Sequence, residues 1–233
     1  FVGGNAAIGL PFLAFHNQEK NLIVRGIGFE QTRRLQEAGY ASEFVFDPIF
    51  NSIVGVNPAQ LKYEALKLLR DSGVKLLLHT YFGDCETRND RIEKITVYNK
   101  SGKEKLEAQI VIDTTGDGDV AARAGAPYVL GREGQPVQAA TLVSRINNVD
   151  FTRYIKFLQE NPYEARELLN DNPDILKDFV DSLSEIPIFV TGGLSSYVKK
   201  AAGKDELKPF NNWVVMVVQP WANFVTLAMS MVP

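Results

Sequence analysis

Apolar residues recur at helical spacing in several segments of the chain. After Asn57 and Pro58, the apolar positions 61, 65, 68 and 69 share one face, and Asn followed by Pro is a typical helix start. Residues 27–37 show helical spacing that ends before Gly39. Three shorter helices are expected later in the chain, beginning after Asp150, Asn161 and Asn172, with Glu164 placed to complete a capping box and Leu176, Phe179 and Val180 facing inward in the third.

Other apolar runs predict strands. Residues 74–80 and 109–113 are short and mostly apolar, which is typical of buried strands in a parallel sheet. Between them, residues 82–108 contain the turn signal Lys100-Ser101-Gly102-Lys103 and predict a three-stranded β-meander. Further strands are expected at 141–146, 213–218 and 224–229, the last two joined at Pro220.

The order of these elements indicates an α/β fold. A helix, a glycine and a buried strand form the second half of a βαβ unit, so we expect a parallel sheet with the β-meander as one crossover. The pattern changes near Gly125, which predicts a boundary between residues 1–125 and a mixed α+β domain at 126–233.

Composition excludes several classes of function. The net charge is -3 and no basic block is present, so nucleic acid is not an expected partner. The single cysteine, Cys85, rules out a disulfide within the chain and a four-thiolate metal site, and no metal ligand set is predicted. No apolar run reaches the roughly 18 residues of a membrane span. We expect a cytoplasmic protein, and the two chain ends suggest an internal piece of a longer one.

The stretch from Ile110 to Gly125 is the candidate chemical site, because an apolar run leads directly into a turn of small residues. At the carboxyl end of a parallel strand, such a turn is where open α/β sheets bind ligands. Three interpretations remain open. One is a dinucleotide fingerprint, Gly116-x-Gly118-x-x-Ala121, although Asp117 and Asp119 would repel a pyrophosphate. The others are a calcium loop that lacks its bidentate Glu, and a plain turn with solvated carboxylates.

This stretch resembles a late segment of FAD-dependent oxidoreductases with a glutathione-reductase-type fold, in the family related to the flavoprotein component of heterodisulfide reductase. The resemblance spans about residues 1–150, with Thr114 in place of Ala and Ala7 in place of Thr as departures. Its motifs are Ile112-Asp113-Thr114-Thr115-Gly116-Asp117-Gly118-Asp119-Val120-Ala121, Ala124-Gly125-Ala126-Pro127, Gly131-Arg132-Glu133, Leu61-Lys62-Tyr63, the strand-like run 73–80, and Gly3-Gly4-Asn5-Ala6.

The resemblance implies a partial FAD/NAD(P)-binding domain at 1–125, without the βαβ unit that carries the pyrophosphate loop, and a partial substrate or cap domain at 126–233. FAD is the implied cofactor. Small residues would let its ring lie against the backbone. The implied cofactor-binding residues are Gly3, Gly4, Asn5, Ala6, Phe82, Thr114, Thr115, Gly116 and Asp117.

Two side chains are candidate catalytic groups. His16 could donate a proton above the flavin or be a surface turn residue, and Arg145 could anchor an anionic substrate or lie on an edge strand. Asp117 could bond to the cofactor or only cap the following helix.

The expected function is transfer of electrons or hydride between FAD and a small organic substrate, with an electron-transfer protein as a possible partner. A nicotinamide-dependent reductase and a non-catalytic binding protein with this fold are the alternatives. By itself, the piece is expected to be inactive and to hold no FAD stably.

Overall fold

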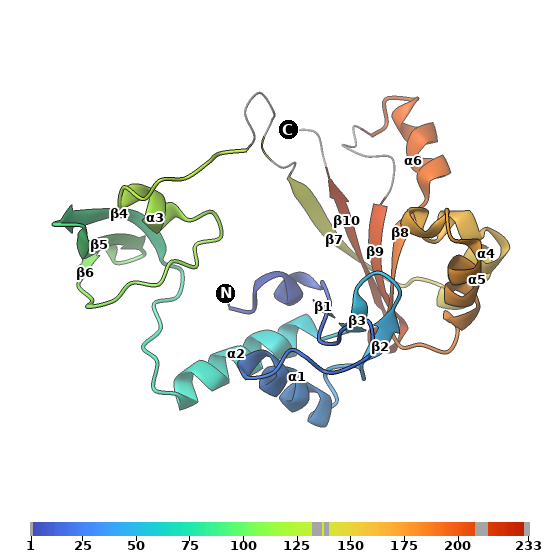
Figure 1. The fold of residues 1–233 in the computed structure, drawn as a ribbon, viewed down its shortest axis with the longest axis horizontal. Helices are drawn as coiled ribbons and strands as arrows, with labels where there is room; N and C mark the ends of the chain where they lie inside the picture. Colours follow the sequence, from blue (N-terminus) through green and yellow to red (C-terminus); the bar gives the residue numbers. More distant parts are fainter. Residues whose placement is uncertain (1, 132–136, 138–139, 208–213, 231–233) are drawn as a thin grey trace. The chain divides into compact units, whose positions relative to one another are not determined.

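The computed structural model describes residues 2–131, 137, 140–207 and 214–230 of the 233-residue chain (Figure 1). The described residues divide into two compact units. One lies within residues 73–138, and the other combines residues 2–72 with residues from 139 onward. Residues before the sequence boundary predicted at 125 therefore pack with residues that follow it.

The unit within residues 73–138 is built on the predicted β-meander. β4 (Tyr81–Arg88), β5 (Arg91–Asn99) and β6 (Gly102–Leu106) form an antiparallel sheet in the order β4-β5-β6, and the short helix α3 (Asp119–Arg123) packs on β4. Asn99 pairs with Gly102, so Lys100 and Ser101 form a two-residue hairpin loop where the turn was predicted. The meander is confirmed.

The predicted parallel strands in this unit are wrong. Residues 74–80 and 109–113 are not strands, and the side chains of Ile110 and Ile112 are 81% and 82% exposed. A parallel strand needs a hydrogen-bonded neighbour reached by a crossover, and none of the described strands pairs with either segment. All pairs between the described strands are antiparallel. The mixed α/β character is confirmed, whereas the parallel sheet does not form among these residues.

The second unit contains two antiparallel sheets, in the orders β1-β3-β2 and β7-β10-β9-β8. Its elements are η1 (Gly4–Ile8), β1 (Phe12–Leu13), α1 (Ile27–Glu37), β2 (Val45–Asp47), β3 (Asn51–Val54), α2 (Pro58–Asp71), β7 (Thr141–Asn147), α4 (Phe151–Glu160), η2 (Pro162–Glu164), η3 (Glu167–Leu169), α5 (Pro173–Ser182), β8 (Phe189–Gly193), α6 (Ser195–Ala202), β9 (Val214–Gln219), η4 (Pro220–Ala222) and β10 (Phe224–Ser230).

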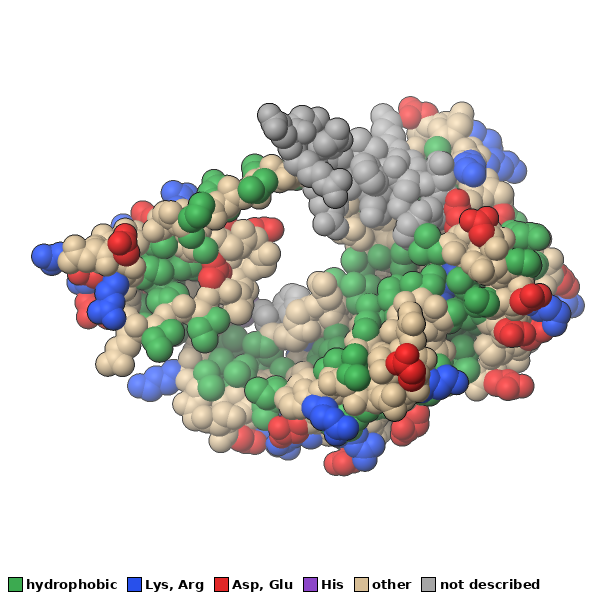
Figure 2. Space-filling view, in the orientation of Figure 1, with side chains coloured by type: hydrophobic (Ala, Val, Ile, Leu, Met, Phe, Trp, Pro, Cys, Tyr) green, Lys and Arg blue, Asp and Glu red, His purple; other side chains and the backbone are tan. Residues whose placement is uncertain are grey.

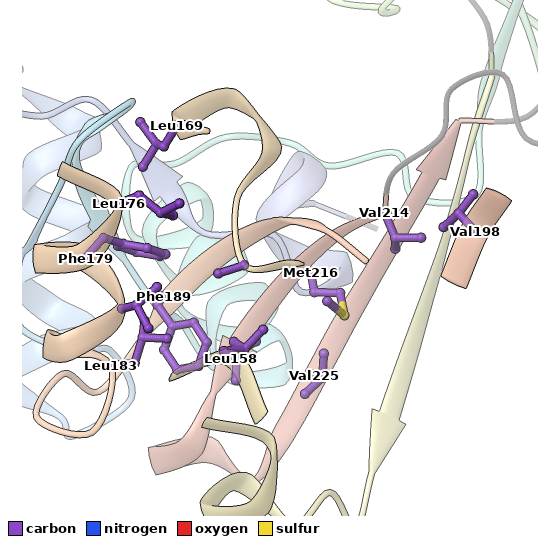
Figure 3. Close-up of a cluster of buried hydrophobic side chains, with 13 residues drawn as sticks. Leu158, Leu169, Leu176, Phe179, Leu183, Phe189, Val198, Val214, Met216 and Val225 are labelled. Atoms are coloured by element: carbon purple, nitrogen blue, oxygen red, sulfur yellow. The ribbon is translucent and has the colours of Figure 1, made fainter. Parts of the chain in front are cut away.

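Strands β8 and β9 of the four-stranded sheet are buried on both faces, whereas the edge strand β7 is mostly exposed. Successive side chains of a strand point to opposite faces, so Met216 and Val217 of β9 belong to different layers. Met216 packs with α4, α5 and α6 in the main core, which Figure 3 shows in close-up. Val217 packs instead with Val45 of β2 and Ile53 of β3. The sheet therefore separates a helical layer from a layer made by the N-terminal residues.

Most predicted helices are confirmed. α1 has the predicted bounds, and α2 begins after Asn57, whose side chain accepts hydrogen bonds from the backbone of Ala59 and Gln60. α4 follows Asp150, which caps it, and α5 buries the predicted face. β7, β9 and β10 confirm the three later strands, although Trp213 lies outside the described residues.

The helix predicted after Asn161 is wrong. Pro162–Glu164 forms a single 3₁₀ turn without a side-chain cap, and η3 follows it. A helix would use the carbonyls of Glu164 and Ala165 for its own hydrogen bonds. Here those carbonyls accept from the backbone of Leu194 and Gly192, at 3.0 and 3.1 Å. Hydrogen bonding to β8 and the residue after it replaces the helix.

Basic and acidic side chains are interspersed over the face of the protein drawn in Figure 2. Among the described residues, no helix combines the length and the apolar character needed to cross a membrane.

Candidate functional site

The glycine-rich N-terminal segment forms the 3₁₀ helix η1. Gly3 and Gly9 flank it in left-handed conformations, and Ala6 and Ala7 are buried against Leu61 of α2. The other side of the segment remains free, because Gly4 and Asn5 are exposed. Packing of the two buried alanines holds η1 against α2, and the backbone of its first residues is exposed.

Asn5 also lines an apolar cavity of about 360 Å³ within the same unit. Leu10 and Phe50 contribute to the cavity from the N-terminal layer, and Val190 and Val217 contribute from the four-stranded sheet. One of the predicted cofactor-binding residues therefore stands at the edge of a space large enough for a small molecule.

The predicted turn at Thr114–Asp117 is exposed and is organised by the residue just before it. One carboxylate oxygen of Asp113 accepts from the backbone N–H and the hydroxyl of Thr115, at 3.0 and 2.8 Å. The other oxygen accepts from the N–H of Ala121 at 2.9 Å. The bonds from backbone N–H groups hold the pKa of the Asp113 carboxyl below its usual value, and the bond from Thr115 has the largest effect.

The side chain of Asp113, and not that of Asp117, accepts a hydrogen bond from a free N–H group at the start of α3. The helix begins after Gly118 without a side-chain cap from the neighbouring residues, and its first N–H, that of Asp119, donates to the hydroxyl of Thr115 at 2.9 Å. Of the two interpretations of Asp117, the helix cap is wrong, because the Asp113 and Thr115 side chains already accept from the free N–H groups, and a bond to the cofactor stays a prediction.

Phe82, the remaining predicted cofactor contact, lies in β4 and not at the end of a strand formed by residues 74–80. It pairs with Val97 of β5, and its side chain is half-buried. The register shifts between Phe82 and Asp84, so the strand is irregular at this point. Phe82 and the turn at 114–117 belong to one unit, and Gly3–Ala6 belongs to the other.

His16 lies in an aromatic cluster of the second unit. Its Nδ1 is 3.0 Å from the hydroxyl of the fully buried Ser52, and its backbone N–H donates to the same oxygen at 3.2 Å. The rings of Phe44 and Phe46 meet the imidazole nearly edge-on, at centroid distances of 4.9 and 5.3 Å. The imidazole is held by these contacts and does not line the cavity beside Asn5.

Arg145 lies on β7, an edge strand of the four-stranded sheet. Its side chain is exposed, and the guanidinium lies 4.7 Å from the centroid of the Phe224 ring. This is a cation–π contact on the sheet surface. Arg145 therefore lies on an edge strand, and its role as an anchor for an anionic substrate stays a prediction.

Two buried polar side chains beneath η1 were not predicted from the sequence. Thr226 is fully buried, its hydroxyl has no hydrogen-bond partner among the described residues, and it lies directly against Gly9. Gln219 is also fully buried and donates to the carbonyl of Gly9 at 3.4 Å. Each residue lies in an otherwise apolar strand, where a single Thr or Gln forms no recognisable sequence pattern. Their common position beside Gly9 is therefore visible only in the folded structure.

Each of the two glycine-containing segments, in its own unit, has glycine backbone that is open to a flat ligand. A Cβ added at Gly4, Gly116 or Gly118 would meet no atom within 4 Å. Gly116 has a φ of +97°, which side chains rarely adopt. At each of these glycines, taken separately, there is open space beside the main chain for a flat aromatic group, and the residues present fit a flavin cofactor in this respect.

The sequence model of the FAD-dependent oxidoreductases matches residues 1–208. The chain belongs to this family. The cofactor of an FAD-dependent oxidoreductase is FAD, which supplies the redox chemistry while the protein binds and orients the reactants. No curated protein matches the chain, and no solved structure does.

Proposed function

We propose that this FAD-dependent oxidoreductase transfers electrons or hydride between its flavin and a small organic substrate. The observation that carries the proposal is the position of Asn5. It belongs to the glycine segment with open backbone, and it lines the apolar cavity. A substrate in that cavity would lie next to the segment that we assign to the flavin ring.

In this proposal, Gly3–Ala6 approaches the isoalloxazine, Phe82 approaches the adenine, and Thr114–Asp117 runs along the cofactor. The motif at 112–127 supports a relation to the flavoprotein component of heterodisulfide reductase and to the glutathione-reductase-type fold. Asp113 contributes by fixing the turn through three hydrogen bonds, which leaves the main chain of Gly116 open.

The two candidate catalytic side chains have different support. The imidazole of His16 already faces Ser52 and two phenylalanine rings, which favours packing over proton transfer. The guanidinium of Arg145 is exposed and could meet an anion at the sheet surface. We therefore propose Arg145, but not His16, as a contact for an external charged group, such as one on an electron-transfer partner.

The nicotinamide-dependent alternative has less support from the geometry. A dinucleotide fingerprint needs a strand before its glycines and a long helix after them. Residues 109–113 do not form a strand, and α3 has five residues. The turn is better suited to lie beside a cofactor than to seat a pyrophosphate by itself.

Anaerobic reduction of the bound flavin tests the proposed function. Dithionite should bleach the visible absorption of the FAD-loaded protein, and at least one organic donor, in a panel of alcohols, amines, thiols and nicotinamides, should do the same. Bleaching by dithionite together with no reduction by any donor and no reoxidation by any organic acceptor would instead identify a non-catalytic flavoprotein.

A further inference from the structure

The cavity beside Asn5 lies between the N-terminal layer and one face of the four-stranded sheet. Val190 of β8, Val215 and Val217 of β9 and Ala228 of β10 form its sheet wall. The strand register places Val217 opposite Val190, and Ala228 opposite Val215. The four side chains therefore form one continuous apolar surface.

The cavity is a partly open pocket and not a closed gap in the interior packing. Concave sites lined mostly by apolar side chains are typical of small-molecule binding. A volume of about 360 Å³ falls within the range of small-molecule sites. The same sheet face is closely packed next to the cavity, where Val217 meets Val45 and Ile53. The cavity is thus confined to one part of a layer that is otherwise closely packed.

The lining selects against charged ligands. Among the described residues that line the cavity none is charged, and Asn5 and Thr141 are the polar ones. Burying an unpaired charge on such a surface is strongly unfavourable. The nearby cation Arg145 does not compensate. In the strand register, Arg145 of β7 lies opposite Thr226 of β10. Its guanidinium lies over the ring of Phe224, two residues before Thr226, whereas Ala228 of the cavity wall comes two residues after Thr226. The positive charge therefore lies on the side of Thr226 away from the cavity.

We propose that this cavity binds the uncharged, apolar part of the substrate, with a size of about one or two fused aromatic rings. The inference rests on the proposed function for its connection to redox chemistry, but the binding itself does not. The amide of Asn5 is the polar contact at the edge of the cavity, on the segment assigned to the flavin. It orients the end of the substrate that remains outside the apolar wall.

Fluorine NMR titrations of the full chain with fluorobenzene, 1-fluoronaphthalene and 4-fluorobenzoate test the proposal. The two neutral probes should bind, and the carboxylate should bind at least about tenfold more weakly. Ala228→Phe, which fills the cavity, should weaken fluorobenzene binding at least about tenfold. Leu227→Phe is the matched control, because Leu227 packs in the core on the opposite face, and it should leave binding unchanged.

A gain-of-binding variant separates the proposal from misfolding. Leu10→Ala enlarges the cavity and should shift the preference toward 1-fluoronaphthalene. Absent binding of both neutral probes, equal binding of the carboxylate, or unchanged binding in Ala228→Phe would overturn the inference. FAD uptake is measured on the natural protein that contains this chain. Probe binding by that protein without FAD uptake would refute the proposed function alone, and FAD uptake without probe binding would refute the cavity proposal alone.

Discussion

Arg166 and Asp47 form a fully buried ion pair that joins two distant parts of the chain. One guanidinium nitrogen of Arg166 donates to a carboxylate oxygen of Asp47 at 2.8 Å, and each side chain is 2% exposed. The rings of Phe50 and Phe179 flank the guanidinium, at 5.6 and 5.0 Å. The pair connects β2 to the segment after η2, and so connects the N-terminal layer to the helical side of the sheet.

Breaking this pair should strongly destabilise the unit. Asp47→Asn leaves the guanidinium without a counter-charge and should lower the free energy of unfolding by about 3 kcal/mol. Asp181→Asn is the control, because the Lys177–Asp181 pair is exposed and should contribute less than about 1 kcal/mol. Denaturant unfolding measures both values. Equal effects of the two substitutions would refute a structural role for the buried pair.

The same pair predicts a specific rescue. Arg166→Met in the Asp47→Asn background removes the uncompensated charge and should recover most of the lost stability. A double variant that is less stable than Asp47→Asn alone would show that packing of the guanidinium against Phe50 and Phe179 is more important than its charge.

Gly9 cannot carry a side chain without disturbing the end of η1. Its φ is +107°, and an added Cβ would overlap the hydroxyl of Thr226. Gly9→Ala should therefore lower the free energy of unfolding by about 2–4 kcal/mol. Gly28→Ala, in α1 where a Cβ meets nothing, should be neutral or stabilising by about 0.5 kcal/mol.

A second change tells the two causes at Gly9 apart. Thr226→Ala removes the overlapping hydroxyl and should recover part of the stability in the Gly9→Ala background, while the cost of the backbone conformation remains. No recovery in thermal or denaturant unfolding would mean that the contact with Thr226 is unimportant.

The turn before α3 should depend on the ionised state of Asp113. Because its pKa is lowered in the folded protein, its contribution to stability is present above the unfolded pKa and is lost as the pH falls through the folded value. At the same pH, hydrogen exchange of the Thr115 and Ala121 amides should be faster in Asp113→Asn than in the unchanged protein. Asp117 accepts none of these bonds in the native protein, so Asp117→Asn should leave the protection unchanged. Equal protection in both variants would contradict the assignment.

Local signals in the sequence predicted much of the fold. Asn57 and Pro58 begin α2 because an Asn side chain can accept the first free N–H groups and proline fits the first turn. The meander followed from its turn residues. The failure after Asn161 has a non-local cause, since the backbone of Gly192 and Leu194 takes the carbonyls that a helix would use. No property of residues 161–165 themselves reveals that competition.

The candidate site was only partly predictable. The motif at 112–127 indicated the family through its resemblance to a segment of FAD-dependent oxidoreductases, whereas the residues of the stretch by themselves left several interpretations open. Runs such as 109–113 resemble buried strands because they are hydrophobic. Hydrophobicity indicates a tendency to be buried, but it does not show whether a neighbouring strand is available for pairing. The cavity was not predicted, since Leu10, Val190 and Val217 each resemble ordinary core residues. The strand register brings Val190 and Val217 together, and packing of the N-terminal layer on the sheet adds Leu10.

The central claim is that FAD lies against the open backbone of the turn at Gly116. FAD binding by the natural protein that contains this chain, measured for Gly116→Ala and Gly102→Ala, tests it most directly. Both glycines have positive φ and no neighbour for a Cβ, but Gly102 lies in the β5–β6 hairpin. The account predicts that the wild type and Gly102→Ala retain FAD, whereas Gly116→Ala binds it at least about tenfold more weakly. A wild type that takes up no FAD, or equal affinity in the two variants, would contradict it.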